Sequence, residues 1–388
     1  MGAPIDHMFA SEQEEATNVV LNAEVKSEMV ASKWPSVDEL RRALPKHCTE
    51  ISLTTSTYYL LRDYAAIAFL YLIVPYVEYY GGFVGLWIWY CIQGLFMSAL
   101  FLIGHECVHG LFAEQNWINI VAGHLSLAPI LIPYYPWEKT HRMHHTHTYH
   151  IEKDKGHPWV EENDYKTRNW FVQHFCAIPI SAFFRFHMYM FLGLPDGSHF
   201  NPLSELLKTN KERFLCLCSG LASALLIYFV VKAGSFSSNT TTYRWPFKTF
   251  WLVMVTYLNH QDDDVEVYEP DTWKYMPAQM QTIDRYFGFG IDHILHHASD
   301  AHVVHHIFFT KIPHYHLMDA TNALVPILEK YNGVYKRKSC YNYLFEFLRF
   351  VLVCLIVTNR DTLRLNIRLE YLVGKGTGTL RYPKTKST

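Results

Sequence analysis

Long apolar stretches without charged side chains dominate the first third of the chain. Phe83–Ile103 holds 21 uncharged residues, enough for a helix to cross about 30 Å of hydrocarbon at about 1.5 Å per residue. The preceding stretch, Tyr64–Tyr80, is nearly as apolar, and only the pair Gly81-Gly82 separates the two. The pattern therefore predicts two membrane spans joined as a tight helical hairpin.

A second pair of apolar stretches follows later in the chain. Phe214–Val231 has 18 uncharged residues, whereas Trp245–Leu258 is shorter and carries Lys248 near its start. A lysine near a helix end can extend its ammonium group to the lipid headgroups, so this second stretch still qualifies as a span. Together the two pairs predict an all-α integral membrane protein with four transmembrane helices in two hairpins.

Other apolar stretches are interrupted by Pro, His, Arg or Glu, and we interpret them as interfacial or re-entrant helices: Trp117–Tyr135, Trp170–Leu194 and Tyr341–Val357. The two ends of the chain are polar. We therefore expect a cytosolic N-terminal segment at 1–50, a membrane domain at 51–372 and a cytosolic tail at 373–388.

Basic residues indicate the orientation. Four of them precede the first hairpin while its turn has none: Arg41, Arg42, Lys46 and Arg62. Positive charge favours the cytosolic side, and an even number of spans returns the C-terminus to that side. The sequon at Asn239 would then be lumenal, and Lys384 and Lys386 would form a cytosolic retrieval signal of the endoplasmic reticulum. The polar start predicts no cleaved signal peptide.

Composition adds one clear signal, the distribution of histidine. The chain has 388 residues and a formal net charge of −2, so charge gives no reason to expect a nucleic-acid partner. Eight scattered cysteines favour reduced packing residues over a disulfide framework. Of 23 histidines, 21 lie between His105 and His316.

Three histidine clusters adjoin the predicted spans. The first places imidazoles at positions i and i+4, and the other two at i, i+3 and i+4, so each cluster presents two or three nitrogens on one helix face. The eight residues are His105, His109, His141, His144, His145, His302, His305 and His306. No crossing is expected between the first two clusters, and two crossings return the third to the same side. All eight can therefore meet in one site.

The ligand type restricts the metal. Neutral imidazole suits iron, zinc, copper or nickel, and a closed structural zinc site needs only four ligands. Eight imidazoles suffice for two metals with positions left open for dioxygen, which indicates oxidative chemistry at paired iron. A zinc transporter or a membrane haem protein would instead place histidines within the spans.

The three clusters, with this spacing and between these spans, resemble the membrane fatty acid desaturase superfamily. Further segments resemble its methyl-end delta-12 and omega-3 enzymes, in particular those of nematodes, and the likeness runs from about Pro35 to about Leu372. These segments are Pro133–Trp137, Glu152–Trp159, Leu194–Phe200 and Lys311–His316. The first cluster departs from the usual pattern, because Glu106 replaces an aspartate and Val108 a glycine.

The resemblance implies that the eight histidines bind two non-haem iron ions in a cytosolic helical cap. It favours His296 as a ninth ligand, with His260 as the competitor. Carboxylates of Glu106, Asp154, Asp292 and Asp300 are candidates for orienting ligand imidazoles.

The resemblance also implies the reaction, the oxygen-dependent formation of a cis double bond in a fatty acyl lipid. We find no nucleotide-binding glycine fingerprint and no fused haem domain, so electrons are expected from cytochrome b5 and its NADH reductase. A basic surface could receive that donor: Lys139, Arg142, Lys153 and Lys155. The spans and Trp117–Tyr135 are the expected wall of an acyl channel.

The segment Gly156–Trp159 favours delta-12 over omega-3 action by resemblance alone. A hydroxylase or acetylenase on the same scaffold remains an alternative. The sequence leaves open the chain length, the acyl carrier and the oligomeric state.

Overall fold

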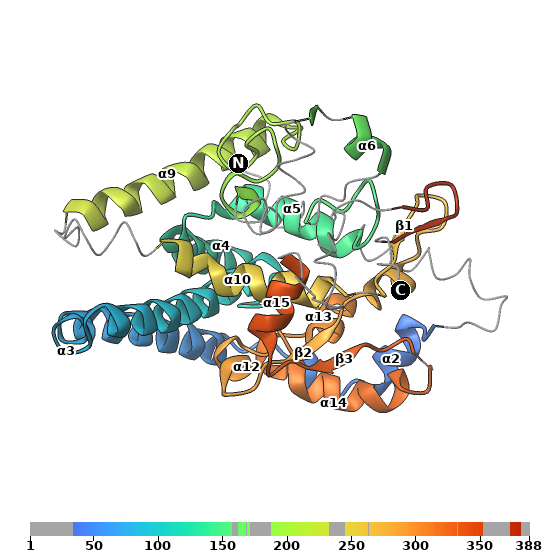
Figure 1. The fold of residues 1–388 in the computed structure, drawn as a ribbon, viewed down its shortest axis with the longest axis horizontal. Coiled ribbons are helices and arrows are strands. Elements are labelled where there is room, and N and C mark those ends of the chain that lie inside the picture. Colours follow the sequence, from blue (N-terminus) through green and yellow to red (C-terminus); the bar gives the residue numbers. More distant parts are fainter. Residues whose placement is uncertain are drawn as a thin grey trace, which may run out of the picture.

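The computed structural model describes residues 34–156, 162–167, 169–170, 188–232, 245–262, 264–331, 333–351 and 373–381. Helices make up most of this part of the chain (Figure 1). They are α2 (Val37–Ala43), α3 (Leu53–Val108), α4 (Asn116–Leu127), α5 (Tyr134–Thr146), α6 (Glu162–Thr167), α9 (Asn210–Lys232), α10 (Trp245–His260), α11 (Tyr275–Gln279), α12 (Ile291–Ile294), α13 (His302–Ile307), α14 (Leu317–Leu328) and α15 (Tyr343–Val351).

Short 3₁₀ turns and two small sheets complete the described elements. The 3₁₀ turns are η1 (Lys46–Thr49), η2 (Ala128–Ile130) and η4 (His314–His316). Strands β1 (Val267–Tyr268) and β4 (Thr379–Leu380) pair antiparallel, whereas β2 (Asp284–Tyr286) and β3 (Arg337–Ser339) pair parallel, with Asp284 opposite Arg337.

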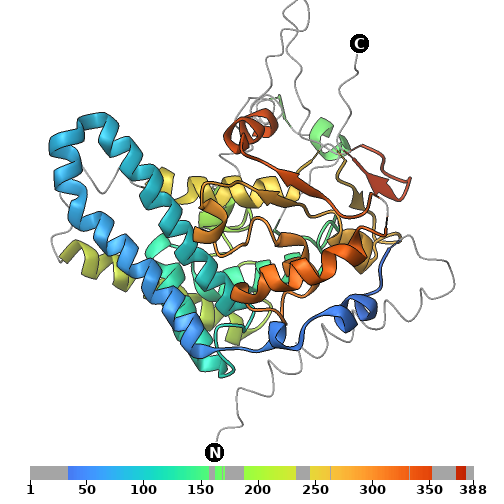
Figure 2. The ribbon, with the colours of Figure 1, turned by 90° about the horizontal axis from the view of Figure 1, so that it is seen from below.

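Helix α3 is a hairpin of two arms. Gly82 has φ 52° and ψ −143°, a conformation open to glycine because it has no Cβ, and the helix reverses there (Figure 2). The arms lie side by side, since the Trp89 indole Nε1 donates to the Leu70 carbonyl at 2.7 Å. The glycine pair thus joins the two predicted apolar stretches at a turn, as expected.

Two described helices are long and apolar enough to cross a membrane, α3 and the Asn210–Phe229 part of α9. A third candidate is the helix pair Asn116–Ile130 and Tyr134–Thr146, which bends by 98° and resembles a broken span or a re-entrant loop. Helix α10 has 16 residues and falls short of a full crossing on its own. The protein is therefore mostly helical with two or three helices that could cross a membrane, where α3 is counted once although its arms reverse at Gly82. The expected four spans in two hairpins stay a prediction.

The helices of the second predicted pair have different neighbours. Helix α10 packs against α3 and α15, whereas α9 packs against α5 and η2 (Figure 1). The Trp251 indole Nε1 on α10 donates to the Cys91 carbonyl on α3 at 2.9 Å. Side chains of α9 such as Leu217, Leu221 and Leu225 are exposed, which suits a surface in contact with lipid.

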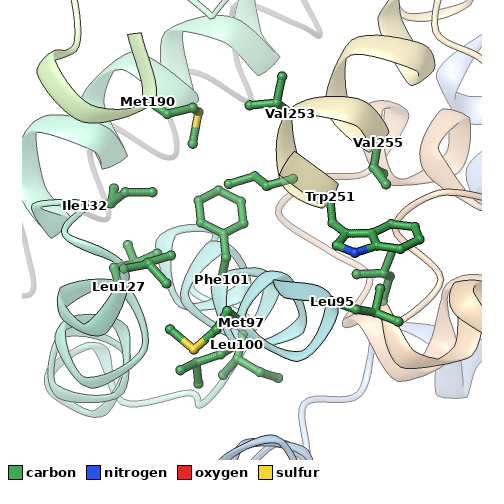
Figure 3. Packing of buried hydrophobic residues seen from close by; sticks show 14 of the residues in the cluster. Leu95, Met97, Leu100, Phe101, Leu127, Ile132, Met190, Trp251, Val253 and Val255 are labelled. Carbon is green, nitrogen blue, oxygen red and sulfur yellow. The ribbon is translucent and has the colours of Figure 1, made fainter. Parts of the chain in front are cut away.

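The main apolar core lies between α3, α4 and α10 (Figure 3). Phe101 on α3 lies at its centre, with Trp251 and Val253 of α10 on one side and Ile132 on the other. Two glycines permit the close approach of α3, α4 and the start of α5. A Cβ on Gly104 would lie 2.5 Å from Leu127 Cγ, and one on Gly123 would lie 2.1 Å from Tyr134 Cε2.

Parts of the predicted terminal segments pack on the domain. Val37 and Leu40 of α2 are buried in a second core with α13 and α14. Near the other end, Leu380 is buried and lies opposite Val267 in the β1–β4 pair. The packed region therefore reaches into both segments expected to be polar flanks.

Several sequence predictions fall outside the described residues. They are the sequon at Asn239, the lysines Lys384 and Lys386, the stretch 157–159 and most of Trp170–Leu194.

Candidate metal centre

The three histidine clusters lie on three helices that end or begin at one place. His105 is in the last turn of α3 and His109 caps it; His141, His144 and His145 are on α5; and α13 begins at His302. A fourth helix joins them, because α10 ends at His260. The i, i+3 and i+4 spacing directs each set of rings inward, as predicted.

Five imidazoles converge in what we call the five-histidine group: His105, His109, His141, His145 and His305. Their Nε2 atoms form a chain of short contacts. His109 Nε2 lies 3.2 Å from that of His105 and 3.2 Å from that of His141. His145 Nε2 lies 3.0 Å from that of His141 and 3.3 Å from that of His305.

Four more imidazoles form the four-histidine group: His144, His260, His302 and His306. The ligand atoms of His144, His260 and His306 lie within 4.8 Å of one another. His260 Nε2 is 3.3 Å from His144 Nε2 and 2.9 Å from His302 Nε2. The two groups adjoin, because the rings of His145 and His306 are 4.2 Å apart between centroids.

The donor set fits metal ions. Two nitrogens bound at right angles to one ion at about 2.1 Å lie about 3 Å apart, which matches the Nε2 separations of 2.9–3.3 Å. A cation would also remove the repulsion between lone pairs that face one another. The residues present therefore fit two ions, one in each group.

The imidazoles on α13 are suited to be neutral ligands. Burial, followed by the neighbouring imidazoles, holds the pKa of His305 and of His306 well below the usual histidine value. Desolvation disfavours the protonated ring, so the lone pair stays available to a metal at neutral pH.

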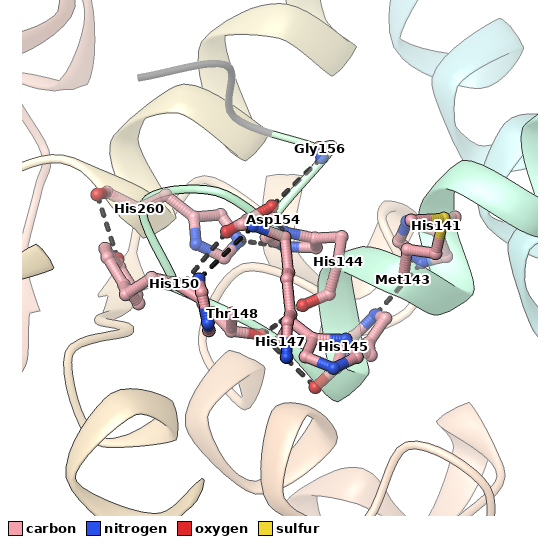
Figure 4. A network of polar contacts seen from close by, with 12 residues as sticks. His141, Met143, His144, His145, His147, Thr148, His150, Asp154, Gly156 and His260 are labelled. Atoms are coloured by element: carbon pink, nitrogen blue, oxygen red, sulfur yellow. Dashed lines mark hydrogen bonds and ion pairs between the residues drawn. The ribbon is translucent and has the colours of Figure 1, made fainter. Parts of the chain in front are cut away.

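Asp154 orients the ring of His144 on α5, a member of the four-histidine group. Its Oδ1 accepts a hydrogen bond from His144 Nδ1 at 2.8 Å (Figure 4). The carboxylate is itself fixed, since it also accepts from the backbone N–H of Tyr149 at 2.9 Å and of Gly156 at 3.0 Å. A Cβ on Gly156 would lie 2.6 Å from His144 Cγ, so only glycine leaves room for the ring.

Gln279 contacts both groups. Its Oε1 accepts from His306 Nδ1 at 3.0 Å, while its Nε2 donates to the His145 carbonyl at 2.7 Å. The Nδ1 atom of His302 donates to the Ala298 carbonyl at 3.1 Å. Bonds to Nδ1 leave Nε2 free to face a metal. Nothing in the sequence singled out Gln279.

The other three candidate carboxylates have different partners. Glu106 Oε1 accepts from the His314 backbone N–H at 2.9 Å. Asp292 accepts from Phe287 N–H and Ser299 Oγ, and Asp300 from His297 Nδ1. Of the four candidate carboxylates, Asp154 is the one with a hydrogen bond to a histidine of the two groups.

His296 lies in neither group, contrary to the preference drawn from the sequence. Its Nε2 is 2.8 Å from Asp63 Oδ2, and its ring is 4.7 Å from that of His314. His296 has a left-handed backbone with φ 53°, which turns it toward the start of α3. The competitor, His260, is the one whose Nε2 reaches the four-histidine group. Like His105, it stands at the end of an apolar helix.

An apolar cavity opens from the histidines. Its wall includes Phe101 and Trp137, then Tyr189 and Met190, and finally Trp251 and Val255, with imidazoles of both groups at one end. Among the described residues, the lining comes from α3, α5, α10, α13, residues 189–190, and the single positions Gly156, Leu295 and Ala298. The expected contribution of Trp117–Tyr135 is not among them.

Comparison with known proteins identifies the family. The fatty acid desaturase family model matches residues 81–339. The chain is 44% identical to a delta-12 fatty acid desaturase of Caenorhabditis elegans, over 95% of this chain and 96% of that protein. It is 40% identical to an omega-3 fatty acid desaturase of the same organism, over 98% and 93%.

A plant relative extends the likeness. The acyl-lipid omega-3 desaturase (cytochrome b5) of the endoplasmic reticulum of Arabidopsis thaliana is 33% identical over 76% of this chain and 77% of that protein. Family model and relatives both cover the segment that carries the two histidine groups. This chain belongs to the fatty acid desaturase family and is an oxidoreductase that acts on fatty acyl chains.

Proposed function

We propose that the two histidine groups hold two non-haem iron ions, with His260 rather than His296 as the ninth ligand. The observation that carries this is the convergence of nine imidazoles in two adjoining groups at the end of an apolar cavity. Iron bound there would supply the activation of dioxygen that removal of hydrogen from unactivated methylenes requires.

The chain's own residues position the substrate and the ligands. An acyl chain offers no polar handle near its reacting carbons, so the wall of Phe101, Trp137 and Trp251 must set which methylenes reach the imidazoles. Asp154 and Gln279 fix ring directions, and the apolar wall excludes water from the reacting carbons.

We further propose delta-12 action, in which a monoenoic acyl chain becomes dienoic. The support is the likeness to the nematode delta-12 enzyme, which is 44% identical over 95% of this chain. The nematode omega-3 relative supports omega-3 action as the second candidate.

Expression in yeast with fatty acid analysis by gas chromatography tests the proposal. We expect a new dienoic acid made from the endogenous monoenoic acids. A trienoic acid from fed dienoic acid would favour omega-3 action instead, and a hydroxy acid would indicate a hydroxylase. The variant His305→Ala is the inactive control. Unchanged fatty acids from a membrane-inserted protein that carries two irons would contradict desaturation.

We propose four crossings in an endoplasmic reticulum membrane, with both termini of the domain at 51–372 facing the cytosol. The α3 reversal supports this, because Arg62 near its start donates to the Ile294 carbonyl while His105 at its end lies in the metal centre. Both ends of the hairpin therefore lie near one site. Protease protection of terminal tags in microsomes tests the orientation, and protection of either tag would contradict it.

Cytochrome b5 and its NADH reductase are the proposed electron donors, on the strength of the plant relative's name. Of the four basic residues expected at the docking surface, Lys139 pairs with Glu212 and Arg142 with Glu138. Of the other two, Lys153 is exposed, whereas Lys155 is half-buried and donates to the Glu152 carbonyl at 2.8 Å. Reduction of purified enzyme by cytochrome b5, slowed by Lys153→Glu, is the expected result; equal rates would argue against this surface.

A further inference from the structure

A third group of metal-ligating side chains lies on the surface, apart from the two histidine groups. It consists of His47 in η1, His316 at the end of η4 and Asp319 in the first turn of α14. One ligand atom from each lies within 4.8 Å of the other two. His47 Nε2 is 3.2 Å from Asp319 Oδ2, and the two imidazole rings are 5.3 Å apart.

A surface ion pair needs only two of these three side chains. The contact between His47 and Asp319 accounts for two of the three side chains, but the ligand atom of a third, His316, lies close to both. Two imidazoles and one carboxylate are a typical ligand set for a divalent transition metal such as zinc, with a fourth position left to water. The side chains of His47 and Asp319 are 50% and 60% exposed, so an ion can enter from solvent.

The three residues join parts of the chain that are far apart in sequence. His47 belongs to the segment before α3, whereas His316 and Asp319 follow α13. Within η4, Tyr315 Oη accepts from the Ser52 backbone N–H at 2.7 Å, and the His314 N–H donates to Glu106 at 2.9 Å. An ion at this surface would therefore fix η4 in the position where it contacts both the start and the end of α3.

We propose that His47, His316 and Asp319 form a site for one divalent transition-metal ion, which clamps the segment before α3 to η4 and α14. The site is separate from the metal centre and does not rest on the proposed function. Its role is structural, because it lies outside the apolar cavity.

Zinc titration of the purified, iron-loaded enzyme tests the proposal. We expect one zinc ion per chain beyond the iron content, measured by mass spectrometry of the metal, and a rise in the midpoint of thermal unfolding. His316→Ala and Asp319→Asn should each weaken zinc binding by at least about tenfold, the low end of losses seen when a metal's surroundings are altered. Cobalt in place of zinc should give a visible ligand-field spectrum that His316→Ala alters.

His293→Ala is the matched control, because His293 is exposed and lies in another surface histidine pair, 5.8 Å between the His293 and His297 rings. It should keep zinc binding and the thermal shift. If zinc binds wild type no more tightly than Asp319→Asn, or if His293→Ala removes binding equally, the proposal is wrong. The iron content of each variant, measured alongside, shows that it is folded. Asp319→Asn, which preserves size and shape, decides the result if His316→Ala loses iron.

Discussion

The two histidine groups of the metal centre are fixed in different ways. In the four-histidine group, Nδ1 atoms bond to Asp154, Gln279 and the Ala298 carbonyl. In the five-histidine group the rings are packed instead, since Trp137 stacks on His141 and Phe309 on His145. Three rings of the four-histidine group are thus fixed by polar partners, whereas two rings of the five-histidine group are held by aromatic stacking.

His260→Ala should have the largest effect, because it removes a ligand from the smaller group. We expect activity in yeast to fall by more than about a hundredfold, with iron falling from two ions per chain toward one. His296→Ala is the matched comparison, and it should retain two irons because His296 bonds to Asp63 outside the centre. The reverse ranking, measured by metal analysis, would restore the preference for His296.

Asp154→Asn should come next. The amide cannot supply the charged acceptor that His144 Nδ1 uses at 2.8 Å, and loss of such a partner costs about 10–100-fold in metal affinity or activity. Asp300→Asn is the control, since Asp300 accepts from His297, which is outside both groups. Equal losses in the two variants would show that the four-histidine group does not depend on its polar partner. Iron affinity by competition with a chelator is the measurement.

Gln279→Met should give a smaller loss, about tenfold in activity, and lower the free energy of unfolding by about 1–3 kcal/mol. It leaves His306 Nδ1 and the His145 carbonyl without the partners they have in the structure. Preferential loss of iron from the four-histidine group would show that this group depends more on Gln279 than the five-histidine group does. Mössbauer spectra of the two irons can measure that loss. Equal loss from both would mean that Gln279 supports the groups equally.

Asp284 offers the smallest and most specific effect, on pH dependence. Its carboxylate accepts from Val303 N–H at 2.8 Å and thus anchors α13, which belongs to both groups. Burial raises the pKa of Asp284 from 3.8 to about 7. Because the folded value exceeds the unfolded one, its contribution to stability is complete below about pH 4 and is lost as the pH rises through about 7.

In wild type, the midpoint of thermal unfolding should fall between pH 5 and pH 8, a range that brackets the folded pKa of Asp284 of about 7. Asp284→Asn should make this fall smaller. Exposed Asp271→Asn serves as a surface control. A decline as steep as that of wild type would rule out the titration of Asp284 as its cause. Differential scanning fluorimetry in detergent gives the midpoints.

Sequence reasoning located what depends on local spacing. The i, i+3 and i+4 rule placed the imidazoles of α5 and α13 on common faces, and the Gly81-Gly82 pair marked the turn of α3. Both features depend on only a few neighbouring residues, so the amino-acid sequence of one protein is enough to predict them.

The features that the sequence did not predict depend on tertiary packing. His260 is a single imidazole whose direction follows from the docking of α10 on α3, and His296 is turned away by a left-handed backbone at φ 53°. Gln279 has no motif, because its role arises only where α11 meets α13. Helix α10 is likewise only 16 residues long, so its apolar composition alone does not establish the fourth crossing, which stays a proposal.

Helix α13 contributes His305 to one group and His302 and His306 to the other. During synthesis the ribosome makes α3, α5 and α10 first, and the chain emerging at that stage carries two incomplete half-sites. Neither half-site is finished until α13 has been translated and docked. The order of the helices along the chain therefore places the completion of both histidine groups late in biogenesis, after the α3 hairpin has been made.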